Sequence, residues 1–326
     1  MSFFQTWVTP EDEQNMRSTL KLFRQADIGI DFMVFLQLCS ALNTYRVQKT
    51  AGRAVASAAN VIPAKHFDVP TTYQPAYKLS VMDKPKLVIF DKDGTLICFH
   101  EMWIPWAMST AQSLKQGTGL SIESEVYQLL GFCPVQRKVG PGLLAEGTMG
   151  QIRNTLTSLL DKKEVPTHIA EALVDSCIRE SFKRSTQSLR ELQHLHKLFV
   201  DLKRAYVKIA ICTADNRDST VMMLRQTGVE GLVDDIMCGD DLGSMPKPHP
   251  HNALAICKNL QVDPEDAIMV GDTVADLGLA RSAGLRAGVG VLSGVGSREY
   301  LEPHADILLD HVGELVSLFG CQKSNI

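Results

Sequence analysis

The chain has 326 residues, of which 45% are hydrophobic and 21% are charged. This composition is ordinary for a soluble globular protein and excludes a largely disordered chain, while the length favours one large core with an insertion, or two domains. The formal net charge of -4 provides no basic field, so nucleic acid is not an expected partner.

The cysteines and the first residues bear on the compartment. The eight cysteines are scattered singly, without a CxxC pair or a zinc-like cluster, which favours reduced thiols in a cytoplasmic protein. The N-terminus turns acidic before any long apolar run, so it does not resemble a secretory signal. Residues 46–65 carry basic residues, alanines and no acid, which indicates a mitochondrial location as the alternative, although they lie too far inside the chain for a standard transit peptide.

Residues 1–80 are expected to form a partly helical N-terminal extension. Between Ile28 and Tyr45, apolar residues recur at helical spacing, as in a helix with one packed face. Polar residues interrupt this run, so a membrane span is not expected. The stretch 62–85 contains four prolines and is predicted to be an extended linker.

Beyond this linker, strands and helices alternate. The apolar run Lys86–Phe90 predicts a buried strand that ends in a carboxylate and a glycine-containing turn. The alternation predicts an α/β fold with a parallel sheet covered on both faces, whose chemistry lies at the carboxyl ends of the strands. The other predicted strands are 207–212, 266–270 and 285–289, and the predicted helices are 189–204, 217–227, 252–260 and 275–283.

The first and second predicted strands are separated by residues 99–188, which are largely helical in pattern and lack convincing strands. A crossover between parallel strands needs only about a dozen residues. The excess predicts an inserted helical cap domain at 99–188, over a core made of residues 81–98 and 189–320.

The strongest motif is Phe90-Asp91-Lys92-Asp93-Gly94-Thr95-Leu96, directly after the first strand. Carboxylates at Asp91 and Asp93, followed by a glycine that can turn the chain, can face one phosphoryl group and one metal ion. One carboxylate could attack phosphorus while the other handles the proton of the leaving group. Taken alone, the motif also fits an acidic turn after a strand.

Three further motifs follow in order. Thr213 ends the second strand and places a hydroxyl at the same edge of the sheet. Lys247 lies between two prolines, which restrict its backbone and suit it to neutralise phosphate charge. After the third strand of this set, Asp272 could be a hard oxygen ligand for Mg²⁺, and Asp276 could be a ligand or an acid favoured in the first turn of a helix.

These four ordered motifs resemble those of the haloacid dehalogenase (HAD) superfamily, from about Lys86 to Leu309. The resemblance implies a Rossmann-like parallel-sheet core with an inserted helical cap. It also implies that Asp91 attacks phosphorus to give an aspartyl-phosphate, and that Asp93 protonates the leaving oxygen and then activates water. These roles agree with the positioning and charge neutralisation that phosphoryl transfer requires.

The same resemblance assigns the remaining roles at the predicted site. Thr213 and Lys247 would hold the phosphoryl oxygens, completing the catalytic set with Asp91 and Asp93. Mg²⁺ would be bound by Asp91, Asp272 and the backbone carbonyl of Asp93, with Asp276 as a further ligand or an orienting group. Because Asp93 is the residue that phosphate-transferring branches use, it argues against dehalogenation.

The helical insertion resembles the cap of the phosphoglycolate phosphatase and phosphomutase branch, and the C-terminal tail is most similar to phosphoglycolate phosphatases. They imply a magnesium-dependent phosphatase acting on a small phosphorylated metabolite, a phosphate monoester similar to phosphoglycolate. In the cap, the loop Gly131–Gly142 carries Arg137 and Lys138, which could grip an anionic substrate tail or could be solvated surface charges. His100, Trp103 and Trp106 follow the first motif, where hinge or core packing is favoured over lining the entrance.

Alternative functions on the same core remain open. A phosphomutase would return the phosphoryl group to a bisphosphate intermediate, and a phosphonate hydrolase would need a cap lysine to form an imine, for which several lysines are present. A non-catalytic scaffold is a third alternative, although the residues whose loss would mark one, Asp91, Asp93, Lys247 and Asp272, are all present. The oligomeric state is not predicted.

Overall fold

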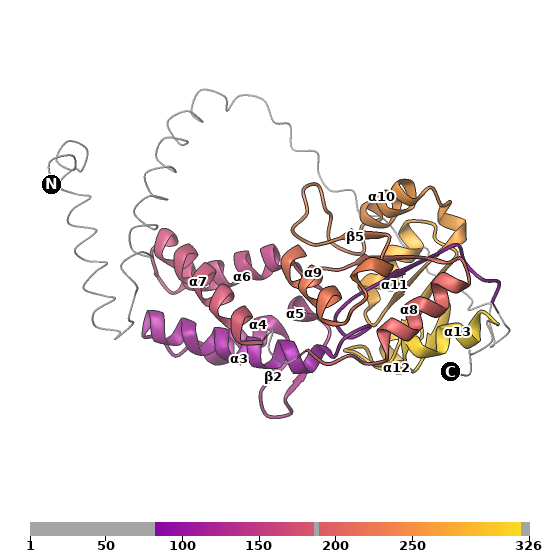
Figure 1. Ribbon diagram of the computed structural model, residues 1–326. Coiled ribbons are helices and arrows are strands. Elements are labelled where there is room, and N and C mark those ends of the chain that lie inside the picture. The colour runs from indigo at the N-terminus through magenta and orange to yellow at the C-terminus, as the bar shows by residue number, and fades with distance from the viewer. Residues whose placement is uncertain (1–81, 186–188, 321–326) are drawn as a thin grey trace, which may run out of the picture. The chain divides into compact units, whose positions relative to one another are not determined.

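The computed structural model describes residues 82–185 and 189–320 (Figure 1). The expected N-terminal extension over 1–80, the segment considered for targeting and the proline-containing linker up to residue 81 lie outside the described residues. In the described part of the chain, no helix combines the length and apolar character that a membrane crossing requires. Each of the six cysteines in this part is a free thiol.

A six-stranded parallel sheet forms the core, with the strand order β5-β4-β1-β6-β7-β8. Four strands match the predicted ones to within two residues, because each is a buried apolar run. β5 and β8 were not predicted: each has three residues, and most of their side chains are only half-buried, so they form no continuous apolar run. The strands are β1 (Leu87–Phe90), β4 (Lys208–Cys212), β5 (Asp235–Met237), β6 (Ala267–Gly271), β7 (Ala287–Val291) and β8 (Ile307–Leu309).

Helices cover both faces of the sheet, as the alternation along β1 shows. Val88 and Phe90 belong to the apolar cluster that includes α8, α9 and α13, whereas Leu87 and Ile89 belong to the cluster that includes α10 and α11. This three-layer arrangement confirms the predicted α/β fold. The bounds are α8 (Leu195–Arg204), α9 (Arg217–Gln226), α10 (His251–Leu260), α11 (Val274–Ser282), α12 (Arg298–Leu301) and α13 (Leu315–Leu318), with short 3-10 helices at Glu230–Leu232, Pro264–Asp266 and Val312–Glu314.

The helix predicted over 189–204 begins only at Leu195. Residues before it form a connection that pairs with the segment leaving β1. Leu192 N donates to Leu96 O at 3.0 Å, and Cys98 N donates to Arg190 O at 2.8 Å. The backbone of this segment is therefore committed to the neighbouring connection and is not available for a helix.

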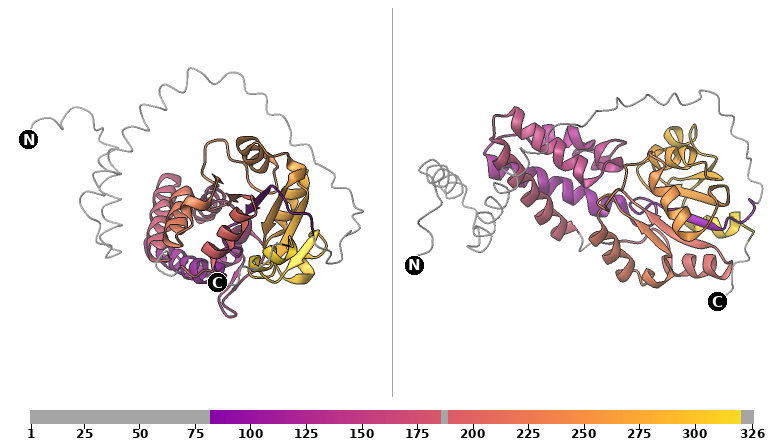
Figure 2. Two further views of the ribbon diagram at one scale, coloured as in Figure 1. Left: turned by 45° about the vertical axis from the view of Figure 1, so that its right-hand side comes forward. Right: turned by 90° about the horizontal axis from the view of Figure 1, so that it is seen from above.

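The segment from α3 to α7, between β1 and α8, is mainly helical, and its helices lie together, apart from the six-stranded sheet (Figure 2). The expected absence of strands is wrong in one place, where β2 (Phe132–Cys133) and β3 (Lys138–Val139) pair antiparallel. Two residues per strand are too few to give an alternation pattern. The helices are α3 (Phe99–Thr118), α4 (Glu123–Leu130), α5 (Leu143–Glu146), α6 (Met149–Lys162) and α7 (Thr167–Ser185).

Candidate active site

Asp91 begins the turn at the carboxyl end of β1, where its N–H donates to Val270 O at 2.9 Å. The turn depends on Gly94, which has φ +92°. A Cβ at Gly94 would collide with the carboxylate of Asp272, as would a Cβ at Gly294. These glycines let two loops close around one carboxylate at the end of the sheet.

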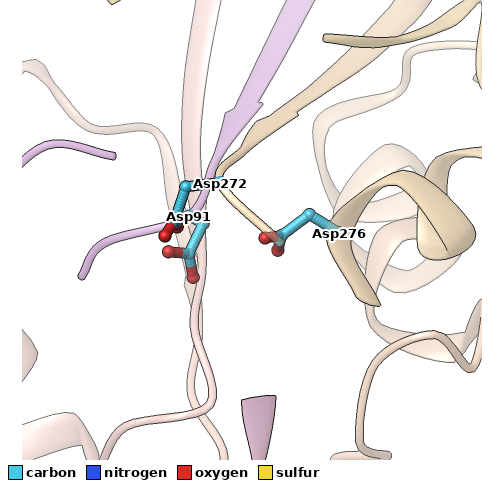
Figure 3. Close-up of side chains that lie close together, drawn as sticks. All are labelled: Asp91, Asp272 and Asp276. Carbon is cyan, nitrogen blue, oxygen red and sulfur yellow. The ribbon is translucent and has the colours of Figure 1, made fainter. Parts of the chain in front are cut away.

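Three carboxylates converge at this edge: Asp91 after β1, Asp272 after β6 and Asp276 on α11 (Figure 3). One oxygen of each lies within 4.8 Å of the others, and all three residues are buried. Asp272 is oriented by Val295 N, which donates to its Oδ2 at 2.7 Å, and by Thr95 Oγ1, which lies 3.3 Å from its Oδ1. We refer to Asp91, Asp272 and Asp276 as the carboxylate cluster.

The charges of this cluster are poorly compensated. Burial raises the pKa of Asp91 to about 7, although the nearby Lys247 opposes the shift. Burial, followed by the charges of Asp91 and Asp276, raises the pKa of Asp272 well above its usual range. Carboxylate oxygens in an electronegative, buried cluster are the donors that a hard divalent cation prefers. The residues therefore fit Mg²⁺.

Lys247 joins two members of the cluster. Its Nζ lies 2.6 Å from Asp91 Oδ1 and 2.6 Å from Asp276 Oδ1. The other oxygen of Asp276 accepts hydrogen bonds from Thr273 N at 3.1 Å and Thr273 Oγ1 at 2.6 Å, as part of the capping box that begins α11. Both oxygens of Asp276 therefore have protein donors already.

The other two predicted residues follow neighbouring strands at the same edge of the sheet. Thr213 follows β4, the neighbour of β1, and is buried with its Oγ1 accepting from Asp215 N at 3.1 Å. The carboxylate of Asp93 contacts Lys92, whose Nζ lies 3.1 Å from Oδ1 and 2.8 Å from Oδ2. Burial raises the pKa of Asp93, while the charge of Lys92 and hydrogen bonds from Lys92 and Trp103 oppose the shift.

The predicted cap cations lie on the β2–β3 hairpin. Arg137 and Lys138 are both exposed. Lys138 lies near enough to His100, at the start of α3, that its charge, after burial, lowers the pKa of His100. Trp103 and Trp106 are buried and pack edge to face with ring centroids 5.4 Å apart, in agreement with the preference for core packing. Trp103 also reaches the site, because it forms a hydrogen bond with Asp93.

Sequence reasoning missed several residues at the site. Lys92 is completely buried and bridges Asp93 to Asp215, whose Oδ2 lies 2.7 Å from its Nζ. The sequence signal for this pair was a lysine shortly after β1 and an aspartate shortly after β4, whose opposite charges could meet at the shared edge of the sheet. On the cap, burial and then the charge of Asp276 raise the pKa of Glu146, and a hydrogen bond with Tyr300 opposes the shift. No sequence pattern pointed to Glu146, because its position depends on how the cap folds.

The motifs at these strand ends have the order of a known family, and a family model for haloacid dehalogenase-like hydrolases matches residues 85–284. The chain belongs to the haloacid dehalogenase-like hydrolase family. The match runs from β1 to the end of α11 and contains the whole carboxylate cluster together with Lys247. The family expected from the four motifs is thus confirmed, and helices α3 to α7 lie between the first and second motifs, as expected for a cap.

Individual relatives are more distant. The pyrophosphatase PpaX of Bacillus velezensis is 26% identical over 242 residues, which cover 72% of this chain and 95% of PpaX. A predicted phosphoglycolate phosphatase from Haemophilus somnus has a similar structure, with a TM-score of 0.57, 20% identity and coverage of 73% of this chain and 99% of its own. CbbY from Rhodobacter sphaeroides, solved with phosphate, gives a TM-score of 0.53 at 21% identity, over 72% of this chain and 99% of CbbY. At these identities the structural likeness concerns the fold.

Proposed function

We propose that the protein is a magnesium-dependent phosphatase that hydrolyses a small phosphate monoester through an aspartyl-phosphate at Asp91. The observation that carries this proposal is the carboxylate of Asp91, paired with Lys247 at 2.6 Å inside a buried cluster suited to Mg²⁺. Phosphoryl transfer needs this combination of a positioned nucleophile and compensating positive charge. The phosphatase names of the relatives support the same chemistry.

The proposed reaction has two steps. In the first, an Asp91 oxygen bonds to phosphorus while the bond from phosphorus to the leaving oxygen breaks, and Asp93 gives its proton to that oxygen. In the second, Asp93 takes a proton from water as the water oxygen attacks phosphorus and the bond to Asp91 breaks, which releases phosphate. Burial raises the pKa of Asp93, which is the direction of shift that a proton donor needs.

The remaining residues hold and neutralise charge. Lys247 and Thr213 would bind the phosphoryl oxygens. Asp91, Asp272 and the backbone carbonyl of Asp93 would hold Mg²⁺, which supplies positive charge to the phosphoryl group. Asp276 would be a further ligand, or would orient Lys247, whose Nζ donates to its Oδ1.

Magnesium is expected to stabilise the folded protein through Asp272. In differential scanning fluorimetry, a Mg²⁺ concentration of about 100 times Kd should stabilise the fold by about 2.7 kcal/mol. Asp272→Asn should lose most of the resulting rise in Tm, because the cluster loses one of its three carboxylates. The matched control is Asp263→Asn, at an exposed aspartate, which should keep the full shift. An undiminished shift in Asp272→Asn would contradict the metal site.

Substitution of the two cations on the β2–β3 hairpin tests the substrate class. We propose that Arg137 and Lys138 bind the anionic tail of a substrate similar to phosphoglycolate. Arg137→Ala/Lys138→Ala should raise KM for 2-phosphoglycolate by about tenfold, the equivalent of one charge-assisted contact, and should leave KM for p-nitrophenyl phosphate unchanged. Lys162→Ala, which removes an exposed lysine elsewhere on the cap, is the control. If the double variant and the wild type have equal KM values for 2-phosphoglycolate, these cations are solvated surface charges.

Product analysis separates the alternatives on this core. Release of inorganic phosphate from a monoester supports the phosphatase, and pyrophosphate belongs in the substrate panel because of the relative PpaX. Transfer of the phosphoryl group to a second sugar hydroxyl would instead indicate a mutase, and cleavage of a carbon–phosphorus bond a phosphonate hydrolase. A protein that binds phosphate but turns over none of these substrates would be a scaffold.

A further inference from the structure

Lys92 lies between the two aspartates of the first motif, yet it is completely buried. Its Nζ lies 2.7 Å from Asp215 Oδ2 and within 3.1 Å of both oxygens of Asp93. Moving an ammonium group out of water costs several kcal/mol, which is recovered only when the charge is well paired. A buried lysine at this position is therefore a costly feature, and its contact with Asp93 raises the question of what it does there.

Asp215 is itself fixed to the scaffold. Its Oδ1 accepts from Asn216 N at 2.7 Å and from Asn216 Nδ2 at 2.9 Å, and its own N–H donates to Thr213 Oγ1. Asn216 in turn caps α9, because its side chain accepts from Ser219 N at 2.9 Å. A continuous set of hydrogen bonds thus connects the start of α9 and the end of β4 to Lys92, and through Lys92 to Asp93.

We propose that Lys92 and Asp215 are positioning residues, which together hold the carboxylate of Asp93 toward the leaving oxygen. Asp215 anchors the ammonium group on the side of β4, so Lys92 stays beside Asp93 and does not turn toward the carboxylate cluster. A displacement of about 1 Å in a reacting group can cost about 100-fold in rate. The inference rests on the proposed function, because it takes Asp93 as the group that moves the proton.

The two chemical steps allow this role to be tested separately from folding. With p-nitrophenyl phosphate, the leaving phenolate needs no proton, so formation of p-nitrophenol in a single turnover does not depend on Asp93. Hydrolysis of the aspartyl-phosphate still requires Asp93 to accept a proton from water. Loss of positioning therefore slows steady-state turnover but spares the first turnover, whereas general damage to the site slows both.

Lys92→Met keeps the length of the side chain and removes its charge. With enzyme in excess over p-nitrophenyl phosphate and Mg²⁺ present, rapid mixing should show a first turnover within about threefold of the wild-type rate, while steady-state turnover falls by about 100-fold. Asp215→Asn retains the contact between Lys92 and Asp93. It should also spare the first turnover, and its steady-state turnover rate should fall by about tenfold. Lys86→Met makes the same substitution at a lysine whose side chain is 68% exposed, and should match the wild type.

Asp93→Asn separates failure of this inference from failure of the proposed function. The proposed function predicts that Asp93→Asn keeps the first turnover near the wild-type rate and slows hydrolysis of the aspartyl-phosphate. If Asp93→Asn shows any other pattern, or if the wild-type protein releases no p-nitrophenol with Mg²⁺, the proposed function is wrong. If Asp93→Asn gives the expected pattern and Lys92→Met turns over normally, or slows both steps equally, the positioning role is wrong. Should Lys92→Met not fold, Lys92→Met/Asp215→Asn carries the same test, because it removes the cation together with one of its two carboxylate partners.

Discussion

Asp91→Asn is expected to reduce magnesium-dependent turnover of p-nitrophenyl phosphate by about 10⁴-fold or more, the largest loss for any single substitution in this protein. An amide cannot replace the carboxylate as the group that attacks phosphorus. The fold should persist, because burial already raises the pKa of Asp91 and a neutral side chain relieves the crowding of negative charge. Steady-state kinetics and a thermal melt of the same preparation measure both effects.

Acid-quenched samples provide a direct test of the covalent step. Intact-mass measurement should find one added phosphoryl group on the wild-type chain and none on Asp91→Asn. Asp263→Asn, at an exposed aspartate, controls for the chemistry of the substitution and should behave as the wild type. Robust turnover by Asp91→Asn, or a phosphoryl group on another residue, would reject Asp91 as the nucleophile.

Lys247→Met is expected to affect both activity and stability. Activity should fall by about 10³-fold, because the phosphoryl oxygens lose a buried cation. The free energy of unfolding should fall by about 3–5 kcal/mol, because two buried carboxylates lose the ammonium group that lies 2.6 Å from each. Urea denaturation measures this loss, and added Mg²⁺ should recover part of it by binding the cluster.

The control for this prediction is Lys258→Met, at an exposed lysine on α10. Its stability and activity should match those of the wild type, since exposed charges contribute little. A stable Lys247→Met protein with little change in turnover would mean that Lys247 neither compensates the cluster nor binds the phosphoryl group.

Sequence patterns predicted the central strands of the sheet better than its edge strands. Strands such as β1 and β6 are buried on both faces and therefore read as continuous apolar runs, and their carboxyl ends necessarily meet at one edge. This is why the proximity of Asp91 to Asp272 could be predicted. The edge strands β5 and β8 are short and only partly buried, so they leave no such pattern.

The contacts of Lys92 could not be predicted from the sequence, for a different reason. Its pairing with Asp215 requires the register of β1 against β4, in which Phe90 lies opposite Ile211, and this register is a property of the assembled sheet. Similarly, Glu146 approaches Asp276 only because the cap folds over the sheet edge. Residues that face the site from another layer of the structure cannot be recognised by their distance along the chain.

The glycines that pack against Asp272 have a consequence for the charge of the site. Gly94 and Gly294 let two backbone segments pack so closely against this carboxylate that a Cβ at either position would collide with it. Burial, followed by the charges of Asp91 and Asp276, raises its pKa, so negative charge is crowded together at this edge of the sheet. Lys247 compensates part of this charge, and a metal ion or a proton would compensate more of it, so we expect the cluster to bind a cation even before substrate arrives.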